Sequence, residues 1–444
     1  MKEYILSQLK KSAKDYELFM QHTKINEIHI QKNRIFLENI TKDRGYGIRI
    51  YNKGIGFSSS NIGTFFAINK TIKDAKKSAS LSEKVQFQFP SQKKFKTVKS
   101  VDKKIKENAE HEIRDFAEQI LNIIPKDVLI SFGKLRTYDS YTDIINSEGL
   151  NVRKEESDFM IEMSLIVEKN GKKVEFWPHQ YRTRIQDISI SDIERWIKIA
   201  RDQLKAKAPK TERTTVIFSP SSVLDGLGSV IGTHASASAK VNGITKLVPE
   251  EKVAVKDLTI ISDGLYPYGL MTNSFDDEGN PQRKINIIEK GIFKNYVYDQ
   301  FYGIKDNHES TGNGLRQGDV FFVFDGKYGV QPTDQISNFY IKPGKKSLEK
   351  LISEVKHGIL VDKFSWLSPD SISGTFSSQI SAGYYIDNGE IADPIKGGLV
   401  TGNFFDLIQN ISGISNESKI ISGGTILAGV CPYIRFENVL VAGE

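Results

Sequence analysis

SPSSVLDGLGSVIGTHASASAKVN, residues 219–242, sets the layout of the second half of this chain. The residues immediately before it, 216–218, are apolar and predict a short buried strand. Ser219 is a favourable N-cap, and Pro220 is a favourable first helical residue because its missing N–H would be unpaired there in any case. The pattern therefore predicts a strand followed by a helix from Pro220 to Lys240.

The two sides of this predicted helix differ in bulk. One side carries apolar residues at helical spacing, namely Val223, Leu224, Leu227 and Ile231. The other side carries small residues, including Gly228 and Gly232, so other backbone can approach it closely. His234 has no second ligand one turn away, so the helix lacks the paired residues that hold a metal ion on a rigid helix.

The composition is that of an ordinary folded protein. Of the 444 residues, 39% are hydrophobic and 26% are charged. The single cysteine, Cys431, excludes an intramolecular disulfide and is typical of a reducing compartment. Residues 1–19 predict an amphipathic helix without a signal-peptide core, and no apolar run approaches the ~20 residues of a membrane span. We therefore expect a soluble, cytoplasmic protein that is not associated with a membrane.

Positive charge is concentrated in the first half of the chain. Residues 1–213 carry 41 Lys and Arg against 29 Asp and Glu, a net charge of +12, whereas the remainder carries 20 against 26. The excess is densest between residues 70 and 106. It could form a nucleic-acid patch, but no aromatic stacking pattern or nucleic-acid module accompanies it. A solvated face with a linker is therefore the favoured interpretation, and nucleic acid is not expected as a partner.

Two units of similar layout are predicted in the first half, over residues 1–90 and 107–204. Each combines helical periodicity with the alternation of apolar residues that is typical of antiparallel hairpins. Helical segments are expected at 1–19, 69–80, 106–123 and 191–204. Stretches near 91–106 and 205–213 have the lysine-rich composition of linkers. We expect both units to be helix-plus-antiparallel-strand arrangements of the α+β class.

Residues 214–444 predict a large, mostly antiparallel β domain with a few helices. Glycine is frequent there, turns are closely spaced, and β-branched runs are short. Strands are expected at 258–261, 284–288, 291–297, 320–323, 339–341, 358–361, 376–386, 425–428 and 434–441. Helices are expected to accompany them at 347–355 and 404–411.

The residues themselves show no catalytic or metal-binding motif. His111-Glu112 is followed by IRDFAEQ, so no second histidine arrives one turn later to complete a helical zinc pair. The serines near residue 219 lack the GxSxG sequence of a nucleophile elbow. Cys431 lies in an apolar run and is expected to be a buried, unreactive thiol. We therefore predict no catalytic residue and no metal ligand.

Two turn-rich segments differ from generic loops. FDDEG, residues 275–279, places three carboxylates beside a glycine, in a turn where one of them could pair with Arg283. STGNGLR, residues 310–316, could cradle an anion through backbone N–H groups, but it lacks the lysine of a P-loop. Either segment could face a substrate cleft or only fix a turn, and the turn interpretation is slightly favoured.

Several segments, read in order, resemble the TldD/TldE family, long described as modulators of DNA gyrase and regarded as metalloprotease-related. The resemblance covers most of the chain and is weakest in its first third. The segments that carry it are VIFSPSSVLDGLGSVIG from residue 216, SFDDEGNPQRKINIIEKGIFKNYVYD from residue 274, STGNGLR from residue 310, GTFSSQISAGYYIDNGEIADPIKGGLVTGNFFDLIQNI from residue 374, and GTILAGVCPYIRFENVLVAG from residue 424.

Within this family, the chain resembles the TldE (PmbA-like) branch. TldD-like members carry an HExxxH helix that binds the catalytic metal together with a cysteine near the carboxy terminus. The corresponding residues here, 224–235, are LDGLGSVIGTHA, and the cysteine position falls near Ser422 and Gly423 rather than at Cys431. The resemblance thus implies no cofactor in this chain and zinc in a TldD-like partner.

The function implied by the resemblance is that of a non-catalytic subunit in a cytoplasmic metalloprotease complex that processes or degrades unfolded peptides. The implied partners are a TldD-like catalytic subunit and an extended peptide held by strand addition. The residues that we infer to line the substrate channel are Gly228, Gly232, His234, Asp276, Asp277, Glu278, Gly312, Asn313 and Arg316. Two alternatives remain open: a binding protein that modulates a DNA topoisomerase or nucleic acid, and a homodimer with an unrecognised activity.

Overall fold

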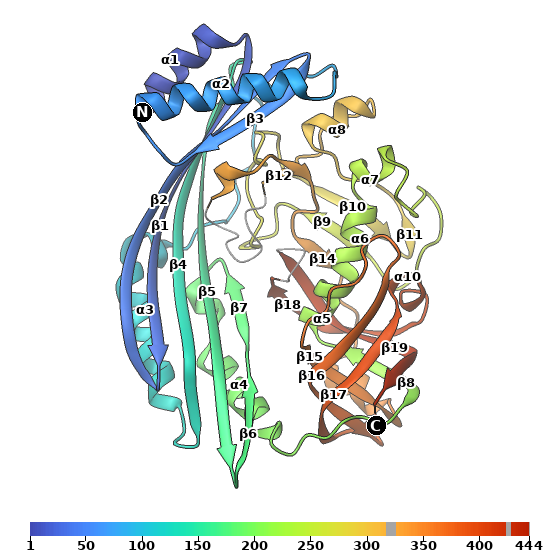
Figure 1. Ribbon diagram of the computed structural model, residues 1–444. Coiled ribbons are helices and arrows are strands. Elements are labelled where there is room, and N and C mark those ends of the chain that lie inside the picture. Colours follow the sequence, from blue (N-terminus) through green and yellow to red (C-terminus); the bar gives the residue numbers. More distant parts are fainter. Residues whose placement is uncertain (317–325, 423–427, 444) are drawn as a thin grey trace.

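A computed structural model of the chain describes residues 1–316, 326–422 and 428–443, arranged as two lobes that each contain a sheet (Figure 1). The first lobe holds a seven-stranded antiparallel sheet of order β3-β2-β1-β4-β5-β6, with β7 paired to β5. Its strands are β1 (Asp15–Gln31), β2 (Arg34–Asn52), β3 (Gly54–Ser60), β4 (Val128–Asn146), β5 (Asn151–Lys169), β6 (Lys172–Phe176) and β7 (His179–Arg182).

Strand β1 joins the two predicted amino-terminal units into a single sheet. It pairs with β2 on one side and with β4 on the other, where residues 17–30 face residues 133–146. Residues 1–90 and 107–204 therefore share a sheet, although each contributes its own hairpins. The residues between them, 83–102, have no regular secondary structure and run along the sheet before α3 begins.

Four helices pack on the sheet of the first lobe: α1 (Lys2–Ser12), α2 (Phe65–Leu81), α3 (Lys103–Ile123) and α4 (Ile190–Asp202). The helices α1 and α2 share a core with one end of the sheet, whereas α3 and α4 share a core with the other end. The expected helix over residues 1–19 ends at Ser12, because the residues from Asp15 onward join the sheet as β1. Leu18 and Met20 face the helices, whereas Glu17 and Phe19 face the second lobe, as the period-two geometry of a strand requires.

The second lobe is built on a ten-stranded sheet of order β11-β10-β9-β14-β19-β17-β16-β15-β8. The tenth strand, β18, pairs with β19 outside this order. The pairings of this sheet are antiparallel except for β14 with β19 and β15 with β8, which agrees with the predicted mostly antiparallel domain. The strand predicted at 320–323 lies outside the described residues, and so does most of the strand predicted at 425–428. The strands are β8 (Glu212–Phe218), β9 (Ile260–Asp263), β10 (Lys284–Glu289), β11 (Ile292–Phe293), β14 (Phe339–Ile341), β15 (His357–Phe364), β16 (Thr375–Asp387), β17 (Glu390–Asn403), β18 (Ile411–Ile421) and β19 (Gly429–Ala442).

Shorter elements connect these strands and cover the sheet. A separate two-stranded ladder pairs β12 (Gly314–Leu315) with β13 (Thr333–Asp334). The short helices are α8 (Gln300–Lys305), α9 (Leu348–Ser353) and α10 (Phe404–Leu407), with 3-10 turns at Ile185–Asp187 and Lys327–Gly329. The helices predicted at 347–355 and 404–411 are thus present but shorter than expected.

The stretch after β8 begins as the sequence predicts. The Ser219 side chain accepts the backbone N–H of Ser222, and Pro220 occupies the first turn. The expected single helix is wrong, because the segment is α5 (Pro220–Val223), a π-helical turn (Leu224–Gly228), α6 (Ser229–His234) and α7 (Ala237–Val241). The break has a local cause: Ser236 is extended and its side chain accepts the N–H of Ala239, so it starts a new helix.

The π-helical turn is packed tightly against α10. A Cβ added at Gly226 would lie 2.0 Å from the ring of Phe404, a residue that is itself fully buried. We expect Gly226→Val to lower the free energy of unfolding by about 2–3 kcal/mol, because overpacking forces rigid neighbours to move. Gly329→Val is the matched control, since a Cβ there meets nothing within 4 Å, and it should change stability by less than about 0.5 kcal/mol. Urea unfolding of the two variants measures the difference, and equal stabilities would contradict the proposed packing.

Candidate functional site

The helical stretch from 220 to 241 packs inside the second lobe. Gly228 is buried and Gly232 is partly buried, among apolar residues of the second-lobe core. His234 is fully buried with both ring nitrogens engaged: Nδ1 accepts the N–H of Lys246 at 2.9 Å, and Nε2 lies 3.0 Å from the carbonyl oxygen of Ile372. Nε2 therefore carries the proton, and burial lowers the pKa of His234, so this neutral ring holds two loops together.

The FDDEG and STGNGLR segments, separated in sequence, pack against each other. Asp276 Oδ1 accepts the N–H groups of Glu278 at 3.0 Å and Asn280 at 2.9 Å. Its Oδ2 accepts the N–H of Gly314, also at 2.9 Å, from the other segment. Asp276 is fully buried, so it fixes the turn of the first segment and joins that turn to the second.

The STGNGLR segment leaves no space for an anion at Gly312. Gly312 has a φ of +77°, and a Cβ there would lie 2.1 Å from the carbonyl oxygen of Pro281, so only glycine fits. Asn313 Nδ2 donates to Ser262 Oγ at 3.1 Å and to the carbonyl of Gln335 at 2.7 Å. Both residues thus shape the loop through contacts inside the second lobe.

A buried ion-pair network crosses from the second lobe to the first. Arg49 on β2 donates to both carboxylate oxygens of Glu17 on β1, at 2.9 and 2.6 Å. Its remaining nitrogen, Nη1, donates to Glu278 at 2.7 Å, and the side chains of all three residues are at most 3% exposed. One guanidinium therefore bridges a carboxylate of each lobe without access to solvent.

Arg316, the last residue of STGNGLR, extends this network. Its Nη2 donates to Glu17 at 2.7 Å, its Nη1 donates to the carbonyl of Val330, and its guanidinium lies 4.3 Å from the ring centre of Phe19. Burial lowers the pKa of Arg316 to about 10, which still leaves it charged at neutral pH. Arg283, in contrast, donates to the carbonyl of Ser310 and has no ion pair among the described residues.

A second branch of the network runs along β5. Lys154 Nζ donates to Asp277 at 2.6 Å, and Lys327 Nζ donates to Glu156 at 3.0 Å. Although burial by itself raises the pKa of Asp277, the charges of Lys154 and Lys327 outweigh it and hold that pKa at about 2. Asp277, Glu278 and Arg316 therefore all contact the first lobe, and none of these buried side chains has significant access to solvent.

The sequence carries a signal for this interface in the charged residues of its long strands. Glu17, Arg49 and Lys154 are charged residues inside long alternating strands, at positions of the same parity as buried residues on the inner face of the sheet. Charged side chains are rarely buried without a partner. Their position therefore points to buried partners, within the sheet as for Glu17 and Arg49 or outside it as for Lys154 and Asp277, although the sequence does not say which ones.

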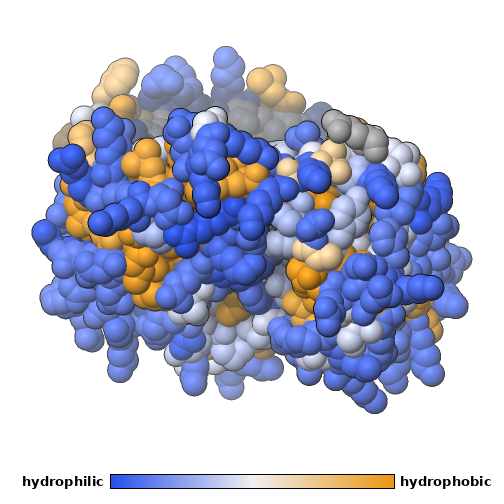
Figure 2. Space-filling model, turned by 90° about the horizontal axis from the view of Figure 1, so that it is seen from below, coloured by the Kyte–Doolittle hydropathy of each residue, from blue (hydrophilic) through white to orange (hydrophobic). Residues whose placement is uncertain are grey.

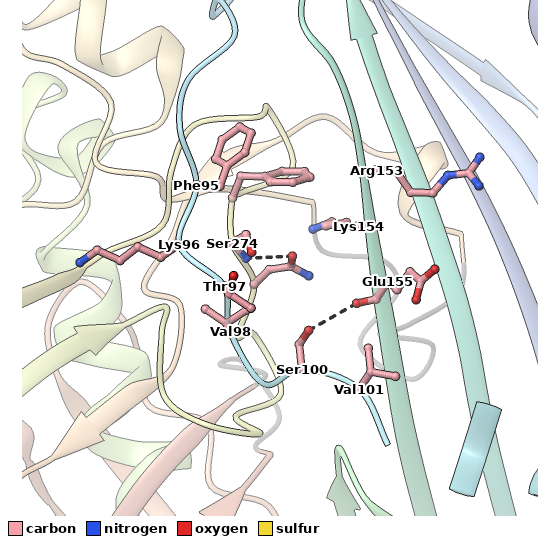
Figure 3. Close-up of a pocket in the computed structure, with 12 residues that line it drawn as sticks. Phe95, Lys96, Thr97, Val98, Ser100, Val101, Arg153, Lys154, Glu155 and Ser274 are labelled. Carbon is pink, nitrogen blue, oxygen red and sulfur yellow. Dashed lines mark hydrogen bonds between the residues drawn. The ribbon is translucent and has the colours of Figure 1, made fainter. Parts of the chain in front are cut away.

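A cavity of about 350 Å³ lies beside the network, between the irregular segment at residues 95–101, the β5 residues 153–155 and the second-lobe residues 273–275 (Figure 3). Phe95 and Phe275 form one wall, with ring centres 4.7 Å apart. Ser100 Oγ donates to the carbonyl oxygen of Glu155 at 3.5 Å. That carbonyl therefore points away from β4, and this edge of β5 has no strand partner beside the cavity among the described residues.

The helical stretch is also connected to the STGNGLR segment. Asp334, which pairs with Gly314 in the small ladder, accepts the N–H of Ser238 at 2.6 Å from the start of α7. Burial raises the pKa of Asp334 to about 6. The nine candidate channel residues thus divide into two places: six lie in the two interlocked segments at the lobe interface, and three lie on the helical stretch.

The donor set on the helical stretch does not fit a metal ion. Between residues 220 and 233 the only possible ligand is Asp225, and His234 uses both of its nitrogens elsewhere. Cys431 is fully buried with its Sγ 3.8 Å from the carbonyl of Phe339, and burial raises the pKa of its thiol well above the usual value. Among the residues that the structure describes, no group of three or more His, Cys, Asp or Glu side chains could hold a metal.

Comparison with known protein families agrees with the order of these elements. Residues 211–443 match the PmbA/TldA metallopeptidase C-terminal domain, which spans more than half of the chain. The chain belongs to the TldD/TldE family. Residues 16–79 of this TldD/TldE-family protein also match the PmbA/TldA metallopeptidase domain 1, which corresponds to β1, β2, β3 and most of α2. The family resemblance seen in the sequence is therefore confirmed, and the family is metalloprotease-related.

Individual relatives cover nearly the whole chain. A zinc metalloprotease TldD homolog of Saccharolobus solfataricus is 26% identical, over 94% of each chain. The crystal structure of TldE from Thermococcus kodakarensis superposes with a TM-score of 0.86 at 24% identity, over 100% of both chains. A proposed modulator of a DNA gyrase from Thermotoga maritima superposes with a TM-score of 0.83 at 20% identity, over 99% of this chain and 98% of that one. These two structures show that the fold is shared.

The network between the lobes makes a specific prediction about stability. Arg49→Met should lower the free energy of unfolding by about 3–5 kcal/mol, because it leaves the carboxylates of Glu17 and Glu278 buried without their common partner. Lys70→Met is the control, since the Lys70–Asp74 pair is exposed and should contribute less than about 1 kcal/mol. Urea unfolding of both variants checks this, and a loss for Arg49→Met no larger than for Lys70→Met would rule out the network as a major constraint.

The raised pKa of Asp334 predicts a pH dependence of stability. Between about pH 4 and pH 6 the folded chain keeps a proton on Asp334 that the unfolded chain releases, so stability falls as pH rises. The decline attributable to this group is at most about 1.4 kcal/mol per pH unit, and its contribution is complete below pH 4. Asp334→Asn should remove that component from unfolding curves measured at pH 4, 5, 6 and 7. The exposed Asp74→Asn should leave it intact, and a parallel decline in wild type and Asp334→Asn would refute the assignment.

Proposed function

We propose that this chain is the non-catalytic, TldE-like subunit of a cytoplasmic metalloprotease complex that processes or degrades unfolded peptides. Its partner in this proposal is a TldD-like subunit that carries the zinc ion. The observation that carries the proposal is the helical stretch from 220 to 234, which corresponds to the metal-binding helix of TldD-like members and offers glycines and serines in place of the ligand pair. A subunit with this surface forms part of the wall of a peptide channel. Its partner carries out the hydrolysis.

The packing around the helical stretch supports a non-catalytic role for this chain. A metal-binding histidine needs one ring nitrogen free for the metal, while the other is held by a second group. Both nitrogens of His234 are held by loop backbone, and freeing either would leave a buried N–H or carbonyl unpaired. The π-helical turn at Leu224–Gly228 is packed against Phe404, so it has little room to present longer side chains.

The proposed substrate is an extended chain, bound mainly through its backbone. The β5 edge beside the cavity suits such a ligand, because successive residues of a strand direct their N–H and C=O groups to alternate sides. Since Glu155 directs its carbonyl toward Ser100, Arg153 directs its backbone groups to the same side, where the cavity lies. Strand addition there would bind many sequences with little side-chain selectivity.

In this proposal the buried ion pairs support the channel without touching the peptide. Asp277, Glu278 and Arg316 hold the second lobe against the sheet that carries the β5 edge. Asp276, Gly312 and Asn313 hold the two loops in the shape that this contact requires. Gly228 and Gly232 have no side chains, so other backbone can approach the helical stretch closely.

The proposal is tested by producing the chain alone, its encoded TldD-like relative alone, and the two together. We expect the two proteins to co-purify, zinc to follow the TldD-like subunit, and cleavage of an unfolded peptide to be chelator-sensitive and faster in the complex. The chain alone should carry no stoichiometric zinc and cleave nothing. Chelator-sensitive proteolysis by the chain alone would overturn the non-catalytic role, and failure to co-purify would overturn the partnership. Retention of DNA on filters at low salt, lost at high salt, would instead favour the nucleic-acid alternative.

A further inference from the structure

The helix-covered face of the first-lobe sheet has a gap between its two pairs of helices, because α1 and α2 form one core with the sheet and α3 and α4 form another. In this gap Arg44 of β2 is paired with His22 of β1, and His22 is paired with Tyr141 of β4. Paired residues of neighbouring strands lie on the same face of a sheet. Met20, two residues before His22, belongs to the core with α1, so this row of three side chains lies on the outer face, away from the second lobe.

A cavity of about 500 Å³ lies at this row and is called the outer-face cavity below. Met1 and Lys2 at the start of α1 line it, together with Asn61 and Gly63 from the loop before α2. It lies near the α1 end of the molecule, which is at the top of Figure 1, whereas Figure 2 shows the molecule from below. A cavity of this size can bury much of the surface of a small organic molecule.

Asp143, on β4, holds two of the cationic side chains of the outer-face cavity in place. Its carboxylate accepts Arg153 Nε at 2.6 Å, Arg153 Nη2 at 2.8 Å and Lys2 Nζ at 3.3 Å. The Arg153 guanidinium also lies 4.5 Å from the ring centre of Tyr141. Figure 3 shows that the Arg153 side chain points away from the cavity between the lobes, whereas that of Lys154 points toward it. Arg153 and Lys2 are therefore fixed at the outer-face cavity, on the other side of the sheet.

The outer-face cavity is positively charged. Three cationic side chains line it against the single carboxylate of Asp143, which is 7% exposed. Arg44 is exposed and has no ion pair among the described residues, so its guanidinium is free to bind a ligand. Burial and the charge of Arg44 lower the pKa of His22, so its ring is neutral at pH 7. The net charge of the lining is therefore +2.

The other groups of the outer-face cavity suit an organic group. The rings of His22 and Tyr141 stack with their centres 4.6 Å apart. His22 Nδ1 is buried without a hydrogen-bond partner in the described part of the chain, so Nε2 is the ring nitrogen that can meet a ligand. Met1 and Met20 add flexible apolar surface. The lining thus combines cations with aromatic and apolar groups.

A phosphate monoester has the chemistry that this lining recognises. The planar guanidinium of arginine binds two oxygens of a phosphate group at once, and arginine is over-represented at phosphate sites for that reason. The two negative charges of a phosphate monoester balance the net charge of the cavity. The cavity is also larger than a phosphate group requires, and the extra space is lined by the apolar and aromatic side chains.

We propose that the outer-face cavity binds a small phosphate monoester, such as a nucleoside monophosphate, with its phosphate group on Arg44, Arg153 and Lys2. The organic part lies against Met20 and His22. The site is separated by the sheet from the lobe interface and from the cavity along β5. The inference assigns binding without a chemical step, and it does not rest on the proposed metalloprotease role.

Calorimetric titration of the full-length chain with adenosine 5′-monophosphate and with ribose 5-phosphate tests the site. We expect both esters to bind saturably at one site per chain, and more weakly as salt is raised. Arg44→Met should raise the Kd of both esters about tenfold, because it removes a charged hydrogen-bond donor. Arg34→Met is the matched control: it removes an exposed arginine from the same strand, about 30 Å away, and should leave both Kd values unchanged.

A second pair of variants tests the contribution of α1. Lys2→Met should raise the Kd of both esters roughly threefold, whereas Lys10→Met, an exposed lysine of the same helix, should not change it. Urea unfolding checks that all four variants remain folded. The proposal is overturned if neither ester binds, or if Arg34→Met weakens binding as much as Arg44→Met. It is also overturned if adenosine without phosphate, or inorganic phosphate without an organic group, binds as tightly as the esters.

Discussion

The contact on which this structure depends is the buried guanidinium of Arg49 between Glu17 of its own sheet and Glu278 of the second lobe. Removing three charges from water costs free energy, and this cost is offset only when every one of them is paired. The pairing can be complete only when the turn at residues 275–279 sits in one position against the sheet. The ion pairs therefore give the two lobes a single relative placement, which apolar packing alone specifies less strictly.

The two loops have the composition of a ligand site. This constraint explains why their polar groups are instead bound by other groups of the protein. Their carboxylates and glycines meet backbone N–H groups and carbonyls, and their remaining charges meet the first lobe. Their contacts hold the second lobe against the sheet of the first lobe. The accessible features lie beside them, at the cavity along β5, where an extended chain could be held next to a rigid interface.

The local rules of sequence analysis succeeded where the cause is local. Ser219 and Pro220 begin a helix, and the alternation within residues 1–90 predicts hairpins whose turns are where Lys32, Asn33 and Lys53 have positive φ values. At Ser236 the same rules missed a second local cap, which competes with helix continuation. They failed where the cause is distant, because the union of the two amino-terminal units depends on β1 pairing with a strand more than a hundred residues away.

The sequence by itself determined the family, the α+β class, the β-rich second half and the absence of the ligand pair from the helical stretch, because each of these is written in residue order or local periodicity. Only the tertiary structure decided which charged residues meet. Glu17, Arg49, Asp277 and Glu278 lie in different strands and loops, so their pairing follows from how the lobes dock and not from spacing.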